Sequence, residues 1–84
     1  MFTVYAIHSE TSDKIYIGQT IDINLRLIQH NSEGTNHLGK FTFQNKGPWV
    51  LVYKEEFKTR TEALKREKQL KSFRGREFVR SLIK

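Results

Sequence analysis

Two neighbouring segments near the start of the chain constrain its fold most, because each alternates with a period of two. Over residues 2–7, β-branched and aromatic side chains fall in turn on two faces, and residues 14–18 repeat the pattern. This period is typical of β-strands, and the polar cluster between the segments is typical of a turn. The segments therefore predict a β-hairpin with Tyr5 and Tyr16 on one face. A turn centred on residues 10–11 would place the two rings directly opposite each other.

The middle of the chain predicts a helix, a loop and a third strand. Thr20 or Asp22 can cap a helix over residues 21–31, and a polar stretch over residues 31–39 indicates a loop. Residues 49–53, after a Gly-Pro break, indicate a strand that is buried on at least one face. One apolar stripe of the predicted helix consists of Ile21, Leu25 and Ile28.

The last third of the chain predicts two helices. Thr59 and Glu62 fit a capping box, which opens a helix that runs to about residue 72 or 73. Gly75 indicates a break between this helix and a short helix that follows it. The predicted order is therefore strand, strand, helix, strand, helix, helix, which is an α/β (α+β) arrangement.

The size and composition of the chain exclude several classes of protein. With 84 residues, the chain has room for one domain, residues 1–84, and no cysteine is present for a disulfide framework, a zinc ribbon or thiol chemistry. No apolar run is long enough for a membrane span, and no signal peptide is visible. We therefore expect a soluble, cytoplasmic protein without a membrane partner.

Positive charge is concentrated near the end of the sequence. Residues 58–84 carry ten basic and three acidic side chains, whereas residues 1–57 carry five basic and six acidic ones. A one-sided basic segment is what a protein that binds a phosphate backbone requires. The alternative is a helical face that carries Lys and Arg only for solvation. On charge alone the two interpretations are about equally supported.

Glu67 is placed unusually on its predicted helix. On a helical wheel it lies between Ala63 and Leu64, inside the arc that should face the core. An unpaired buried carboxylate is costly, so this side chain needs a cation, a hydrogen-bond network or water in a cleft. A structural alternative is an ion pair with a nearby Lys or Arg at the edge of the arc.

Arg26 and His30 lie four residues apart and share one face of the helix predicted for residues 21–31. A guanidinium can stabilise the charge on a phosphorane, and an imidazole can transfer or orient a proton. The alternative is a surface arginine beside a partly buried histidine. No P-loop, dinucleotide fingerprint or Ser-His-Asp arrangement is present.

In combination these positions resemble a known family. Val4-Tyr5 is followed after ten residues by Tyr16-Ile17-Gly18, which is similar to the paired motifs of the GIY-YIG nuclease superfamily. Arg26 and His30, and the second glutamate of the segment from Glu62 to Lys71, stand at the spacing of that family. The chain looks most like small stand-alone members related to the N-terminal nuclease domain of the UvrC-like excinucleases.

The resemblance implies a small three-stranded antiparallel sheet flanked by helices. It also implies a divalent-metal-dependent endonuclease that nicks or cleaves DNA, in repair or recombination. Tyr5 would activate the attacking water or hold the residue that does, and Tyr16 would contact the scissile phosphate. Arg26 would stabilise the pentacovalent phosphate, and His30 would assist proton transfer. Glu67 would bind one Mg²⁺ or Mn²⁺ ion, and Gly18 is the glycine of the second motif.

Two positions depart from the family pattern. Thr3 stands where the family name has glycine, and residues 68–84 contain no asparagine, although many members carry one there. We expect the basic tail to hold the DNA backbone with low sequence specificity, through side chains that are all Lys or Arg: Lys68, Lys71, Arg74, Arg76 and Arg80. A protein partner or a homodimer would then supply targeting.

Two other functions stay open, and the missing asparagine favours the first of them. One is a non-catalytic DNA-binding or adaptor module that keeps the GIY-YIG fold. The other is a protein-interaction domain that uses the face of the third strand around Trp49.

Overall fold

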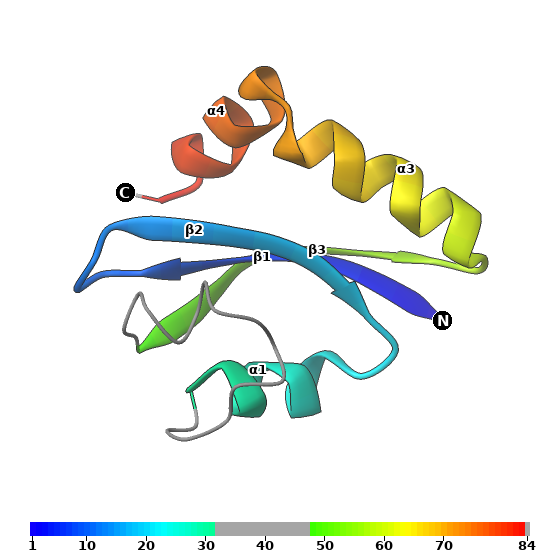
Figure 1. The fold of residues 1–84 in the computed structure, drawn as a ribbon, viewed down its shortest axis with the longest axis horizontal. Coiled ribbons are helices and arrows are strands. Elements are labelled where there is room, and N and C mark those ends of the chain that lie inside the picture. The colour runs from blue at the N-terminus through cyan, green and yellow to red at the C-terminus, as the bar shows by residue number, and fades with distance from the viewer. Residues whose placement is uncertain (32–47, 84) are drawn as a thin grey trace.

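A computed structural model describes residues 1–31 and 48–83, with only the backbone of residues 30 and 31 (Figure 1). The elements follow one another in the predicted order and form an α+β fold. They are β1 (Phe2–Ser9), β2 (Lys14–Thr20), α1 (Ile23–Asn31), β3 (Trp49–Phe57), α3 (Arg60–Lys71) and α4 (Phe73–Ser81). The loop predicted after residue 31 lies outside the described residues. No described helix has the length and apolar character that crossing a membrane would require.

The three strands form one antiparallel sheet in the order β2-β1-β3, so β1 is central and β2 is an edge strand. The predicted hairpin is confirmed, and Tyr5 and Tyr16 lie on one face, but the predicted register is wrong. Tyr5 pairs with Gly18, and Tyr16 pairs with Ile7. The loop between the strands spans residues 10–13, and Asp13 has a positive φ of 53°. This loop shifts the pairing by two residues, which keeps every side chain on its predicted face.

Helices cover both faces of the sheet. In Figure 1, α3 and α4 lie on one side of the sheet and α1 lies on the other. The α3–α4 side buries Val4, Ala6, Ile15 and Ile17 against side chains of the two helices, which are Ala63, Leu70 and Val79. The α1 side buries Tyr5, Ile7 and Trp49, with four partly buried neighbours, Tyr16, Ile23, Leu27 and Leu51. The strands of the hairpin therefore separate two apolar clusters.

Trp49 and the apolar stripe of α1 are placed differently from what the sequence suggests. Trp49 is 2% exposed, so it belongs to the core and does not offer a surface to a partner protein. The interaction-domain hypothesis therefore cannot use the Trp49 side chain itself as a contact surface. Ile21, Leu25 and Ile28 are exposed, because α1 instead turns Ile23 and Leu27 towards the sheet.

The junction between α3 and α4 lies at Ser72 rather than at Gly75. Ser72 Oγ donates to the Gln69 carbonyl and accepts a hydrogen bond from the Gly75 amide, so one side chain ends α3 and begins α4. Gly75 lies inside α4, where a Cβ atom would collide with the backbone of Gln69 and Leu70. The glycine thus serves a close approach between helices, and its predicted role as the break is wrong.

Two sets of polar contacts fix the position of α3. At its start, the predicted Thr59 cap is confirmed, since Thr59 Oγ1 accepts from the Glu62 amide at 3.2 Å. Further along, Arg66 Nε donates to Glu55 Oε1 at 3.0 Å, and the Tyr53 hydroxyl donates to the same oxygen at 2.8 Å. These bonds tie α3 to β3, and the buried Ala63 and Leu70 seat it on the sheet.

Candidate active site at the β2 edge

Tyr5 extends across the sheet over the position where Gly18 has no side chain. A Cβ atom at Gly18 would lie 3.0 Å from the Tyr5 hydroxyl and 3.1 Å from Cε2 of Tyr16. The two tyrosine rings are tilted by 40° with their centroids 6.2 Å apart, and Tyr5 is 1% exposed. Because β2 is an edge strand, this packing brings the Tyr5 hydroxyl from the central strand towards the rim of the sheet.

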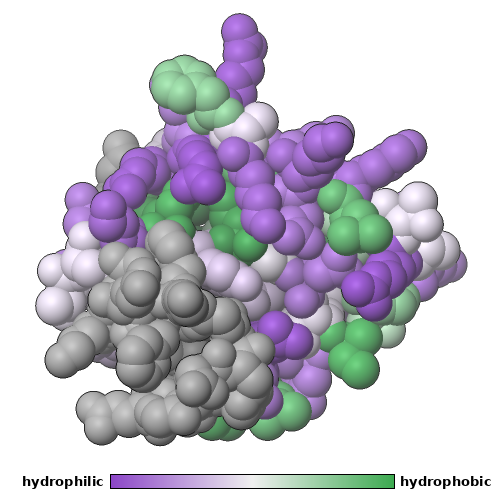
Figure 2. Space-filling model, in the orientation of Figure 1, coloured by the Kyte–Doolittle hydropathy of each residue, from purple (hydrophilic) through white to green (hydrophobic). Residues whose placement is uncertain are grey.

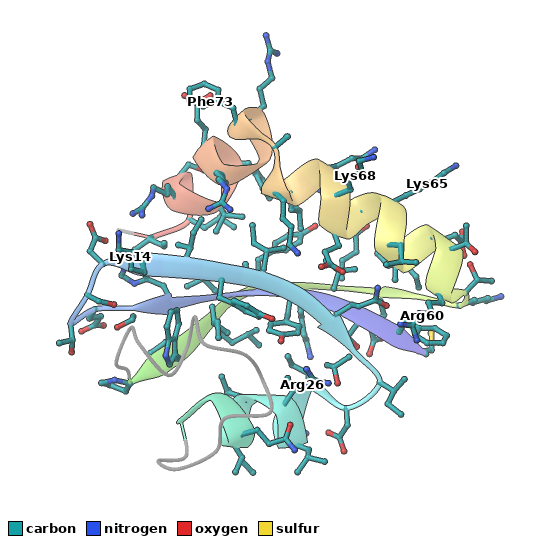
Figure 3. All side chains as sticks on the ribbon, viewed as in Figure 1. Lys14, Arg26, Arg60, Lys65, Lys68 and Phe73 are labelled. Carbon is teal, nitrogen blue, oxygen red and sulfur yellow. The ribbon has the colours of Figure 1, made fainter. Side chains whose placement is uncertain are left out.

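Arg26 approaches the same hydroxyl from α1. Its side chain lies on the side of α1 that faces the sheet (Figure 3), and its guanidinium lies near enough to the Tyr5 hydroxyl to affect the pKa of that phenol. Burial raises the pKa of the Tyr5 phenol above its ordinary value, and Tyr16 raises it further, whereas the charge of Arg26 lowers it. We call Tyr5, Tyr16, Gly18 and Arg26 the tyrosine half of the site.

Glu67 reaches the same rim from α3, on the other face of the sheet. Its negative charge raises the pKa of Tyr5, which places the two side chains within electrostatic range. Gln19 Nε2 donates to Glu67 Oε1 at 3.3 Å, and Lys71 Nζ lies 2.7 Å from Oε2. The Glu67 side chain is 16% exposed. We call Glu67, Gln19 and Lys71 the glutamate half.

The anomaly of Glu67 on the helical wheel thus has a structural explanation. The carboxylate is half-buried at the edge of the core, and its charge is balanced by Lys71, as the ion-pair alternative predicts. It also lines a surface cleft of about 320 Å³ together with Leu64, Lys68 and Lys71. Balance by a lysine and access from a cleft are compatible, because the Lys71 side chain is 49% exposed and can move.

His30 lies near the end of α1, four residues after Arg26, and its side chain is outside the described atoms. The structure therefore places Tyr5, Tyr16 and Arg26 together on the α1 face of the sheet. Glu67 lies beside β2 on the opposite face, where it contacts Gln19, the residue next to Gly18. The sequence patterns assigned no role to Gln19. Its side chain shares a strand face with Ile15 and Ile17, so the period of two could have placed it towards α3.

The chemistry of Glu67 fits one hydrated divalent cation. Mg²⁺ is commonly held by one or two carboxylates, with water and phosphate oxygens at its other positions. Within the described parts of the chain, no three His, Cys, Asp or Glu side chains gather to form a larger ligand set. The Oε2 atom of Glu67 already lies 2.7 Å from the Lys71 ammonium, so a cation at this carboxylate would meet a positive group there.

The basic residues predicted to bind DNA are all exposed, but they are not equivalent. Hydrophilic side chains predominate over α3 and α4 in Figure 2, with exposed apolar residues such as Phe73 and Leu64 among them. Lys65 and Lys68 point away from the sheet in Figure 3. Arg80 is engaged with the hairpin loop, since its guanidinium contacts Asp13 Oδ1 at 3.3 Å and the Asp13 carbonyl at 3.1 Å. Arg76 Nε donates to the Lys71 carbonyl at 3.2 Å.

Lys68 and Arg74 differ from these residues. Within residues 1–31 and 48–83, neither side chain takes part in an ion pair or a hydrogen bond, whereas Arg76 donates to a carbonyl and Arg80 to Asp13. They are thus the members of the predicted set whose charges are most available to a phosphate backbone.

The arrangement is that of a GIY-YIG domain. A small antiparallel sheet carries a tyrosine packed over a motif glycine, the first helix supplies an arginine, and the helix after the third strand supplies a glutamate. The family described as "GIY-YIG catalytic domain" matches residues 1–77. The chain therefore belongs to the GIY-YIG family, as its motifs indicate.

Curated relatives of similar length support this assignment. The chain is 34% identical to a UPF0213 protein of Staphylococcus epidermidis over 68 residues, which cover 81% of this chain and 78% of the relative. It is 42% identical to a UPF0213 protein of Staphylococcus saprophyticus over 59 residues, 70% and 67% of the two chains. A UPF0213 protein of Staphylococcus aureus is 38% identical over 71 residues, 83% and 79% of the two chains. No solved structure matches the chain.

Proposed function

We propose that this protein is a divalent-metal-dependent endonuclease that hydrolyses phosphodiester bonds in DNA. The observation that carries the proposal is the convergence of Tyr5, Tyr16, Arg26 and Glu67 at one edge of the sheet, from β1, β2, α1 and α3. A general base or orienting group, a guanidinium and a carboxylate ligand are the groups that phosphoryl transfer to water requires.

In the proposed reaction, a water oxygen attacks phosphorus and one bond from phosphorus to a deoxyribose oxygen breaks. Arg26 stabilises the negative charge that develops on the phosphate oxygens, and Tyr16 orients the phosphate. Glu67 would hold Mg²⁺ or Mn²⁺, which supplies Lewis-acid stabilisation of the phosphate when bound. His30 is proposed to assist proton transfer to or from the reacting oxygens.

The role of Tyr5 follows from its environment. Burial raises the pKa of its phenol, so the hydroxyl keeps its proton near neutral pH while the site holds no cation. In that state Tyr5 can only orient the water. The positive charge of Arg26 opposes the effect of burial, and a second cation at Glu67 would offset the carboxylate that also raises the pKa. Tyr5 is proposed to act as general base only when the site is fully loaded.

Recognition of the substrate is proposed to depend on the backbone. The exposed Lys68 and Arg74 on α3 and α4 would contact phosphates, which predicts weak sequence preference and strong dependence on salt. A cytoplasmic location and a role in DNA repair or recombination are part of this proposal.

Nicking of supercoiled plasmid in the presence of Mg²⁺ or Mn²⁺ tests this proposal. We expect the wild-type protein to convert supercoiled plasmid to open circles, and Arg26→Ala to lower the rate about 100-fold or more. Glu67→Gln should lose most of the nicking activity, and the nicking that remains should not depend on Mg²⁺ or Mn²⁺. Glu77→Gln, which changes an exposed glutamate of α4, is the matched control and should nick normally. Nicking that is unchanged in Arg26→Ala and Glu67→Gln would rule out this site.

A second candidate is a DNA-binding module without catalysis. The observation that favours it is the ion pair between Lys71 and Glu67, which satisfies the carboxylate without a metal. In this case, binding to a short duplex would fall with salt but would not respond to Mg²⁺ or Mn²⁺, and the plasmid would stay supercoiled.

A further inference from the structure

The shorter of the two polar contacts that hold Glu67 is the one with Lys71. The ammonium lies 2.7 Å from Oε2 of a carboxylate whose side chain is only 16% exposed. Two features hold Lys71 there. Glu67 and Lys71 are spaced i and i+4 with the acid first, which is the favourable order on a helix, and Lys71 is the last residue of α3, where the helix dipole attracts a cation.

The contact also determines which oxygens of Glu67 are available. Oε1 accepts a hydrogen bond from Gln19, and Oε2 holds Lys71. An ion that binds this carboxylate must either displace the ammonium or lie a few ångströms from it, where two positive charges repel each other. The cleft beside Glu67 is lined by Lys71 itself and by Lys68, so the free ammonium would stay at the mouth of the site.

We propose that Lys71 is an internal competitor for the divalent cation at Glu67, and that the cation displaces it onto a phosphate of the bound DNA. This inference rests on the metal site of the proposed function and adds a regulation to it. Lys71 leaves Glu67 when the ion binds, and its ammonium can then bind a DNA phosphate. Lys71 therefore couples the binding of the ion to the binding of DNA. The ion should therefore strengthen DNA binding, and DNA should strengthen ion binding. In the absence of both, the site rests in a closed, charge-balanced state.

Binding of Mn²⁺ without DNA tests the competition directly. Free Mn²⁺ can be followed by its electron paramagnetic resonance signal in titrations of wild-type protein, Lys71→Met and Lys68→Met. Lys68 is the matched control, because it lines the same cleft on the same helix and makes no ion pair with Glu67. We expect Lys71→Met to bind Mn²⁺ about five- to tenfold more tightly than wild type, and Lys68→Met less than about twofold more tightly.

Two results of this titration would overturn the proposal. One is equal gain in Mn²⁺ affinity for Lys71→Met and Lys68→Met, which would indicate only a general effect of charge. The other is no Mn²⁺ binding by any variant. Lys71 is exposed, so folding of the variant is not expected to fail, and a thermal melt verifies it.

Transfer of Lys71 to phosphate is tested by the salt dependence of DNA binding, with Ca²⁺ as the probe ion. One extra phosphate contact steepens the plot of log affinity against log salt by about 0.9 on duplex DNA. We expect Ca²⁺ to steepen the plot for wild type but not for Lys71→Met. Glu67→Gln, in which Lys71 is already released, should have the steeper plot without Ca²⁺. Identical plots for wild type and Lys71→Met would overturn the transfer.

Cleavage is not measured in either experiment, so the outcomes separate the two proposals. Tighter Mn²⁺ binding by Lys71→Met in a protein that never nicks DNA would refute the nuclease function alone. Normal nicking with unchanged Mn²⁺ affinity in Lys71→Met would refute the role of Lys71 alone.

Discussion

The tyrosine half and the glutamate half of the site lie at the same edge of the sheet but are held by different forces. Tyr5 is 1% exposed and packs over Gly18, so its position is determined by the shape of the core. Glu67 is held by Lys71 and Gln19, two polar side chains at the border of a cleft. Packing fixes a group to within tenths of an ångström, whereas a partly exposed ion pair can exchange partners at low cost.

The difference suggests a division of tasks. The half that must be in place before substrate arrives is built into an apolar cluster that also stabilises the fold. The glutamate half, which we propose accepts a cation and releases it again, is held by contacts of small net energy. Variants in the tyrosine half should therefore cost both stability and activity, and variants in the glutamate half should cost activity alone.

Gly18→Val should have the largest effect on stability. A Cβ atom at this position already meets the Tyr5 hydroxyl at 3.0 Å, and the methyl groups of valine would force both tyrosine rings away. Overpacking of this kind costs about 1–3 kcal/mol. We expect the urea midpoint of unfolding to fall and nicking to be lost. A variant with unchanged stability would show that Tyr5 is not held by packing over Gly18.

Tyr5→Phe should have a smaller effect on stability. It keeps the ring and removes a buried hydroxyl group that lies near Arg26, and losing the polar contacts of such a group costs about 1 kcal/mol. Activity should fall much further, since the variant removes the proposed base. The unfolding free energy from urea titration and the rate of plasmid nicking measure the two effects.

The same variant tests the charge state of Tyr5. Because the pKa of its phenol is raised in the folded state, the hydroxyl contributes stability below the unfolded pKa of about 10, and this contribution is lost as the pH rises further. Tyrosinate absorbance up to about pH 10.5 should therefore be the same in wild type and Tyr5→Phe. A larger signal in wild type in that range would contradict the proposed burial of the phenol.

Glu67→Gln should change stability little and abolish activity, in contrast to Gly18→Val, which should lower both. The exchange breaks a partly exposed ion pair, for which the expected change in unfolding free energy is within about 1 kcal/mol. Nicking should nevertheless be lost with the metal ligand. Loss of stability as large as that of Gly18→Val would contradict the comparison, because it would show that Glu67 is a structural anchor.

Sequence patterns predicted the fold where local chemistry determines it. The period of two placed Tyr5 and Tyr16 on one face, and the helical wheel identified Glu67 as a polar group at the core edge. The register failed because it depends on the length of the hairpin loop and on the left-handed backbone of Asp13, which alternation does not encode.

Patterns also failed where two elements meet. Glycine is a poor helix former, which predicts a break at Gly75, but here the residue allows α4 to approach the end of α3. In α1, the stripe of Ile21 and Leu25 is exposed while Ile23 and Leu27 are buried. Which side of a short helix faces the sheet depends on how the preceding strand leads into it, and no single segment determines that.

Asp13 lies outside both halves of the site, so a variant at this position is a reference for changes that do not touch the site. It belongs to the hairpin loop, where its carboxylate contacts His8 at 3.0 Å and Arg80 at 3.3 Å. Hydrogen bonds from His8 and Arg80 lower the pKa of this carboxyl group. A lowered folded-state pKa contributes stability above the unfolded pKa of about 4, and the contribution is lost as the pH falls through the folded pKa.

Asp13→Asn should therefore have the smallest effect of these variants. Asparagine tolerates the positive φ of this position, so the variant changes the charge with little backbone strain. Thermal melts should show wild type slightly more stable than Asp13→Asn at pH 7, with the gap closing towards pH 3, and nicking should be unaffected. A gap that stays constant with pH would mean that the loop is held by its backbone alone. Lost nicking would mean that the anchor of α4 to the hairpin also positions the catalytic edge.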